Sequence, residues 1–122
     1  MHKNTIDTSS DNYFISTTIG EVRHDDLMKI LTEGLRTSMH KRTPIIFDFR
    51  NVEFKLTLVE LYNLIKQLEI NIEVMTKIVD ISLVFDKQKS YEFTKFFKDT
   101  LKSSGFISVN SFNDFNEAAK HH

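Results

Sequence analysis

The sequence predicts an α/β fold with a four- to five-stranded, mostly parallel sheet and helices mainly on one face of it. Segments typical of strands alternate with segments of helical hydrophobic spacing, in the order β-α-β-α-β-α-β-α. Such alternation is typical of parallel strands joined by right-handed crossovers. Polar residues such as Asp48, Asp80 and Ser82 interrupt the strands, whereas strands covered on both faces are continuously apolar. The second face is therefore expected to be only partly covered.

Residues 1–122 are expected to form one domain, because chains of this length usually build a single core. No repeat, linker or low-complexity segment marks a boundary. Residues 1–10 are expected either to be flexible or to add a short strand near Lys3–Asp7. They lack the apolar stretch of a signal peptide, and no run in the chain approaches the roughly 20 apolar residues of a membrane helix. A cytoplasmic protein is therefore expected.

The first elements are a strand, a helix and a second strand. Period-two alternation predicts a strand at Tyr13–Ile19, and Gly20 permits a turn after it. Leucine and isoleucine at helical spacing predict a helix that begins near Asp25, where an acidic side chain favours the helix dipole. Pro44 ends that helix. The apolar run Ile45–Phe49 then predicts the second strand.

A capping box opens the second helix. After a predicted loop at Asn51–Leu56, Thr57 and Glu60 have the spacing at which each side chain accepts a hydrogen bond from the other residue's backbone N–H. This helix is expected to run to about Asn71, and residues 73–76 are expected to connect it to the next strand.

The second half of the chain repeats the alternation. Ser90 is placed to cap a third helix, and Gly105 is placed to end it in the left-handed conformation. The predicted elements are a strand at Lys77–Phe85, a helix from Ser90 to about Lys102, a strand at Phe106–Phe112 and a short helix from Asn113 to about Lys120.

The composition narrows the function. A net charge of −1, from 16 Lys and Arg against 17 Asp and Glu, gives no basic surface for nucleic acid. The absence of cysteine excludes a zinc–thiolate site and a thiol nucleophile, and three glycines provide no phosphate-binding loop. His24 and His40 lie near opposite ends of one predicted helix, too far apart to share a metal. His121 and His122, either native or the remnant of an expression tag, are left out of the metal argument. A non-enzymatic protein without cofactor or metal is expected.

Two segments carry a resemblance to a known family. Ile45–Leu64, IIFDFRNVEFKLTLVELYNL, resembles the central segment of STAS domains, the fold of bacterial anti-sigma-factor antagonists. In that family an apolar strand ends in Asp, a turn follows, and an Asp-Ser-x-Gly motif opens a helix. Asp48 matches the strand-end Asp, and Thr57 matches the regulatory serine. Phe112–Lys120, FNDFNEAAK, is similar to the close of SpoIIAA-like members, so the resemblance covers nearly the whole chain by element order.

The resemblance implies a STAS-like regulatory module that acts by binding another protein, of kinase-like or sigma-regulator type. A homodimer is a further oligomeric state that it allows. Leu56 and Val59 stand where the family motif has Asp and Gly. The phospho-switch is therefore predicted to be degenerate, with Thr57 serving as a helix cap. The residues assigned to the switch or partner loop are Asn51, Glu53, Lys55 and Thr57.

A different class of function follows from the second helix, whose apolar face is wider than packing on one sheet requires. One interpretation is an ordinary core helix. The alternative is that the extra apolar side chains form either a partner surface or the wall of a pocket for a small apolar ligand or lipid. The pocket is similar to what a CRAL-TRIO-like arrangement implies. The residues assigned to this pocket or interface are Phe54, Leu58, Tyr62 and Ile65.

Overall fold

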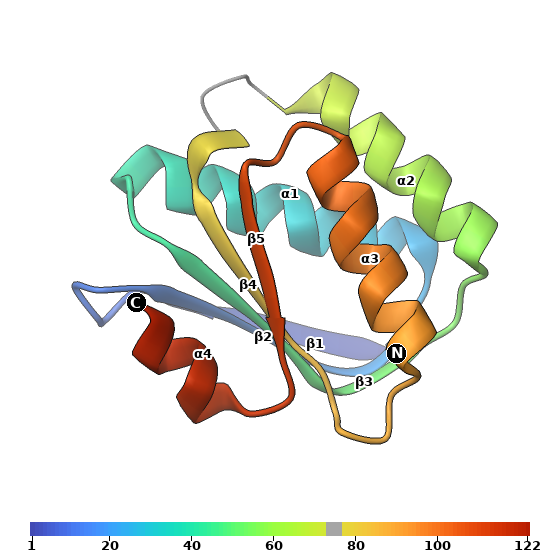
Figure 1. Cartoon of the computed structure of the whole chain (residues 1–122), viewed down its shortest axis with the longest axis horizontal. Helices are drawn as coiled ribbons and strands as arrows, with labels where there is room; N and C mark the ends of the chain where they lie inside the picture. The colour runs from blue at the N-terminus through green and yellow to red at the C-terminus, as the bar shows by residue number, and fades with distance from the viewer. Residues whose placement is uncertain (73–76) are drawn as a thin grey trace.

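A computed structural model describes residues 1–72 and 77–122 of the chain (Figure 1). The predicted connection at residues 73–76 lies outside the described residues. The strands are β1 (His2–Asp7), β2 (Phe14–Val22), β3 (Ile45–Phe54), β4 (Asp80–Val84) and β5 (Ser108–Phe112). The helices are α1 (His24–Lys41), α2 (Leu58–Asn71), α3 (Tyr91–Ser103) and α4 (Phe115–His121).

The strands form one sheet in the order β1-β2-β3-β4-β5. β1 is antiparallel to β2, and the pairs from β2 to β5 are all parallel. The predicted mostly parallel sheet is thus confirmed. Of the two expectations for the N-terminus, the short strand near Lys3–Asp7 is confirmed, because His2–Asp7 pair with β2 along their whole length.

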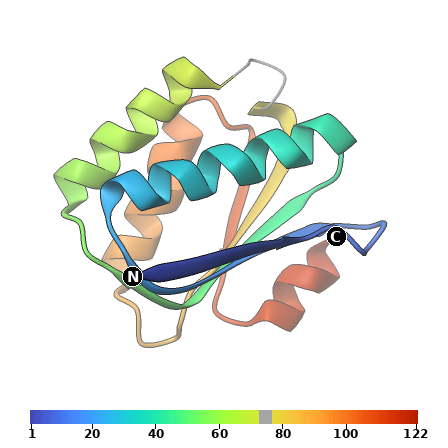
Figure 2. The ribbon, with the colours of Figure 1, turned by 180° about the vertical axis from the view of Figure 1, so that it is seen from behind.

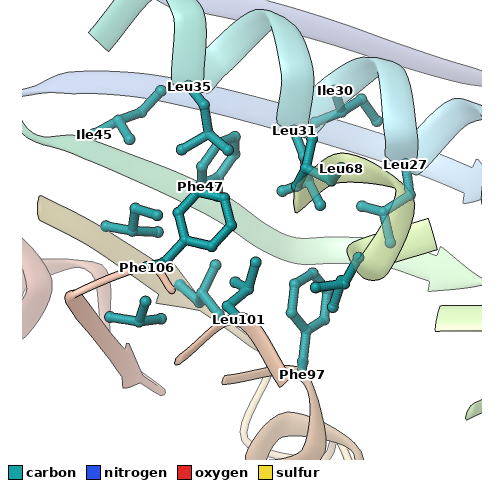
Figure 3. Packing of buried hydrophobic residues seen from close by; sticks show 14 of the residues in the cluster. Leu27, Ile30, Leu31, Leu35, Ile45, Phe47, Leu68, Phe97, Leu101 and Phe106 are labelled. Atoms are coloured by element: carbon teal, nitrogen blue, oxygen red, sulfur yellow. The ribbon is translucent and has the colours of Figure 1, made fainter. Parts of the chain in front are cut away.

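The three longer helices cover one face of the sheet, and α4 lies on the other (Figures 1 and 2). The main core lies between the sheet and α1, α2 and α3. Phe47 is completely buried there, in contact with leucines and isoleucines from the helices (Figure 3). Gly34 of α1 makes room for this ring, because a Cβ atom at that position would lie 2.6 Å from Phe47 Cε1. Helices mainly on one face are therefore confirmed.

The second face has a smaller apolar cluster, formed by Ile46, Val84 and Ala118 of α4. His122, just after α4, places its Nε2 atom 2.8 Å from the hydroxyl oxygen of Ser82 in β4. The buried Asp48 carboxylate accepts two hydrogen bonds from the Arg50 guanidinium. Among the described helices, only α4 packs on this face, as the polar residues within the strands predicted.

β3 is longer than predicted, and the expected loop at Asn51–Leu56 is wrong up to Phe54. Between the pairs Thr17↔Asp48 and Ile19↔Asn51, β2 advances two residues while β3 advances three. The extra residue is a bulge that reverses the alternation of side chains along β3. Apolar residues therefore face the core at Phe49 and again at Val52 and Phe54. Because this alternation is broken, the sequence pattern of Asn51–Phe54 resembles that of a loop.

β2 also runs past the turn that was predicted at Gly20. Gly20 lies within the strand with φ at +104°, and its pairing with β3 continues to Val22. β4, by contrast, is shorter than predicted at its start, because Lys77–Val79 form a turn whose Lys77 carbonyl accepts from the N–H of Ile107 at 3.1 Å. Gly105 follows α3 with φ at +97°, as predicted for a helix end.

Candidate functional site

Thr57 lies at the carboxyl edge of the sheet, where parallel strands end and the next helices begin. As the N-cap of α2, its hydroxyl oxygen accepts from the N–H of Glu60 at 3.1 Å. The Glu60 carboxylate accepts from the N–H of Thr57 at 2.9 Å. The predicted capping box is therefore confirmed. The second oxygen of this carboxylate lies 3.6 Å from His24 Nδ1, at the start of α1.

Lys55 and two glutamates form a charged row beside the cap. The Lys55 ammonium lies 2.7 Å from the Glu53 carboxylate and 4.0 Å from that of Glu21 in β2. Its hydrogen bond to Glu53 raises the pKa of Lys55 and lowers the pKa of Glu53. The N–H of Lys55 donates to the Val22 carbonyl at 2.8 Å. The ion pair is thus exposed to solvent, whereas the backbone that carries it is hydrogen-bonded to β2.

Phe54 points from the same segment into a group of phenylalanines. Its ring centroid lies 5.0 Å from that of Phe93 and 5.5 Å from that of Phe49. The Lys89 ammonium lies over two of these rings, 5.0 Å from the centroid of Phe54 and 4.4 Å from that of Phe93. Partial burial lowers the pKa of Lys89, and the charge of Glu53 partly opposes this. The side chain of Phe54 is thus half-buried and packs within this aromatic group at the carboxyl edge of the sheet.

Sequence reasoning missed Lys89. It lies in the turn between β4 and α3, and its N–H donates to the Asp86 carbonyl at 2.9 Å. The signal that points to it is topological, because loops after neighbouring parallel strands meet at the same edge of the sheet. The chain therefore brings Lys89 beside Glu53 and Phe54 from a distant part of the sequence.

The assigned apolar residues of α2 do not share one surface. Tyr62 is 45% exposed and Leu58 36% exposed, and both lie near the start of the helix. Val59, which was not assigned to the pocket, is 69% exposed beside them. Ile65 is completely buried in the main core and does not reach the surface. The exposed apolar residues near the cap are therefore Leu58, Val59 and Tyr62.

Asn51 stands apart from the cap. It lies within β3, exposed, and pairs with Ile19 of β2 on the far side of the bulge from Asp48. The strand that replaces the predicted loop holds Asn51 away from the start of α2, whereas Glu53, Lys55 and Thr57 follow one another along the edge.

Three cavities in the described part of the chain are lined by other residues than the assigned apolar set. The first, about 430 Å³, lies at the amino edge of the sheet between Met39, Pro44 and Ile78. The second, about 600 Å³, is a shallow polar depression between α1 and α2. The third, about 220 Å³, lies between α3 and the end of β5. Phe54, Leu58, Tyr62 and Ile65 line none of the three.

Within residues 1–72 and 77–122, no three histidine, aspartate or glutamate side chains gather as metal ligands. None of the helices in the same ranges is long and apolar enough to cross a membrane.

The arrangement of strands and helices matches that of SpoIIAA-like proteins. The unphosphorylated form of the anti-sigma factor antagonist SpoIIAA superposes with a TM-score of 0.57 at 15% identity, over 98% of this chain and 96% of that one. An uncharacterized Shewanella loihica PV-4 protein with a SpoIIAA-like fold gives a TM-score of 0.60 at 14% identity, over 98% and 92% of the two chains. No protein-family model and no curated protein matches the sequence. The chain therefore has the SpoIIAA-like, STAS-type fold that its central segment predicted.

Proposed function

We propose that this chain is a non-enzymatic regulatory module that binds another protein through the surface around the start of α2. The observation that carries the proposal is a group of exposed apolar side chains next to a charged row. Exposed apolar residues that are grouped and rimmed by polar ones are typical of protein-binding surfaces. We call this surface the α2 cap surface, and its residues are Glu53, Lys55, Thr57, Leu58, Val59 and Tyr62.

The kind of partner is proposed from the fold. The chain shares its fold with SpoIIAA, which is an anti-sigma factor antagonist. A partner of the kinase-like or sigma-regulator class is therefore the one we propose. Fold alone transfers function weakly, so the apolar group on α2 remains the main support.

The phospho-switch of this module is proposed to be degenerate. The Thr57 hydroxyl already accepts from the N–H of Glu60, and the Glu60 carboxylate bonds to the N–H of Thr57. A phosphate on Thr57 would stand beside this carboxylate, and like charges so close repel. In addition, the side chain of Val59 is 69% exposed at the position where the family motif has glycine. Thr57 is therefore assigned to capping.

Substitution of Val59 tests the surface. We expect Val59→Asp to lose most of the binding to the native partner, because a buried unpaired carboxylate is costly in an apolar interface. Ile70→Asp is the matched control, since Ile70 lies on the same helix, is 82% exposed and is far from the cap. Partner capture from the source cells, quantified for each variant, is the measurement. Equal capture by both variants would place the partner elsewhere.

A second candidate function is the binding of a small apolar ligand, favoured by the 430 Å³ cavity at the amino edge of the sheet. Met39, Pro44, Ile78 and Val79 supply its apolar walls, and Arg42 and Asp80 stand at its polar rim. Native mass spectrometry of the purified protein distinguishes the candidates. A bound apolar molecule that is lost on Val79→Asp substitution supports this function, and an unliganded protein contradicts it.

A further inference from the structure

β1 is an edge strand with a free side. It is the outermost strand of the sheet, dark blue in Figure 2, and among residues 1–72 and 77–122 it pairs with β2 alone. Its six residues, His2–Asp7, are all extended, which makes it long enough to pair with another strand. A free strand edge carries unpaired N–H and C=O groups that can be extended by a further chain.

The pairing of β1 with β2 fixes which backbone groups are free. The N–H of Glu21 donates to the Met1 carbonyl at 3.3 Å. In an antiparallel pair, backbone groups of alternate residues point to the same neighbour. The backbone groups of Lys3, Thr5 and Asp7 therefore point toward β2, and those of His2, Asn4 and Ile6 point away from the sheet.

We propose that the free edge of β1 pairs with β1 of a second copy of this chain, antiparallel and about a two-fold axis at Thr5. In that register the outward groups of Asn4 bond to those of Ile6 of the partner subunit. Lys3 then stands opposite Asp7 of the partner subunit, and by symmetry the same pair forms a second time. Two five-stranded sheets become one continuous sheet.

Charge complementarity favours this occupant over an unrelated strand. Lys3 and Asp7 are both exposed and lie two residues on either side of Thr5. Opposite charges on directly opposed residues stabilise an antiparallel pair, and like charges destabilise it. A charged edge strand discourages other chains from pairing. In this register the β1 sequence thus pairs its own opposite charges against a copy of itself.

The geometry of Asp7 supports the pair. One of its carboxylate oxygens accepts from the N–H of Ser9 at 2.9 Å, and the residue is exposed. Asp7 carries its charge at neutral pH, as an ordinary aspartate does, and hydrogen bonds from Ser9 lower its pKa further. Lys3 and Asp7 would face each other at non-hydrogen-bonded positions, where opposing side chains come closest.

Charge reversal tests the proposal by sedimentation equilibrium. We expect the wild type to form a dimer, and Lys3→Asp to raise its dissociation constant by about tenfold or more, because two pairs of carboxylates then oppose each other. The double variant Lys3→Asp/Asp7→Lys restores the dimer. Lys29→Asp, an equal change on the exposed side of α1, leaves it unchanged. A monomeric wild type, or a dimer indifferent to Lys3→Asp, overturns the proposal.

Disulfide trapping tests the register independently, because the chain has no cysteine of its own. Thr5→Cys is expected to form an intermolecular disulfide, since opposed non-hydrogen-bonded residues lie within disulfide range. Lys3→Cys and Asp7→Cys, exposed on the same face, are expected to cross-link only when the two variants are mixed. Cross-linking of all three variants at equal rates would mean random collision and would overturn the register.

Discussion

Gly20 is a residue at which the β1–β2 pairing depends on the absence of a side chain. Its φ is +104°, and a Cβ atom there would lie 2.5 Å from the Met1 carbonyl oxygen. Gly105 has a similar φ, +97°, but the nearest atom to a Cβ atom there is 3.4 Å away, on the flexible Lys77 side chain. A side chain at Gly105 would therefore meet only the strained φ, whereas a side chain at Gly20 would meet the strained φ and a steric clash.

Alanine substitution at these two glycines should have unequal effects. Gly105→Ala is expected to lower the free energy of unfolding by about 1–2 kcal/mol, the cost of a strained φ. Gly20→Ala adds a clash with backbone and should lower it further, by about 1–3 kcal/mol more. Urea denaturation of both variants provides the comparison. Equal losses would mean that β1 shifts away without cost.

The interactions of single residues could be predicted from the sequence where both partners are close in the chain. Thr57 and Glu60 are three residues apart, and their reciprocal hydrogen bonds follow from that spacing alone. Lys89 and Phe54 are 35 positions apart in the sequence. Their contact depends on how β3 and β4 lie side by side, which no local pattern encodes. The burial of Ile65 likewise depends on which side of α2 meets the core.

At the level of elements, the start of α2 depends on its capping box. Thr57→Ala removes the hydroxyl acceptor of the Glu60 N–H and is expected to lower the free energy of unfolding by about 1 kcal/mol. Thr57→Ser keeps the acceptor and is the matched control, with little loss. Urea denaturation measures both. If Thr57→Ala is as stable as wild type, the cap contributes nothing and the assignment of Thr57 to capping fails.

Element boundaries were predictable where the alternation of side chains is unbroken. The bulge in β3 shifts that alternation by one residue after Phe49, so the second half of the strand reads as a loop. Gly20 similarly indicates a turn, although β3 supplies hydrogen-bond partners that continue β2 through it. In both cases pairing with a neighbouring strand overrides the local signal.

At the level of the whole molecule, the charge state of His122 links the attachment of α4 to pH. His122 Nε2 lies 2.8 Å from the Ser82 hydroxyl, on the face of the sheet that α4 covers. Burial lowers the pKa of His122 below its ordinary 6.5, and the charge of His121 lowers it further, while Asp80 partly offsets both. Folding therefore favours the neutral imidazole.

The sign of the pH dependence follows from this direction. Well above pH 6.5, His122 is neutral in both the folded and the unfolded chain, and its contribution to stability is complete. As the pH falls below 6.5, the unfolded chain binds the proton first, so the free energy of unfolding decreases until the folded form is protonated too. Comparison with a variant that differs only at this position isolates the contribution of His122.

His122→Gln isolates this effect, because glutamine retains a hydrogen-bonding side chain but does not titrate. We expect wild type to lose more stability than His122→Gln between pH 7.5 and pH 5.5, both values being about one pH unit from the ordinary pKa of histidine. Chemical denaturation at the two pH values gives the difference. A matching loss in both proteins would show that His122 remains solvated. The apolar cluster around Ile46, Val84 and Ala118 would then hold α4 to the sheet without a contribution from the charge state of His122.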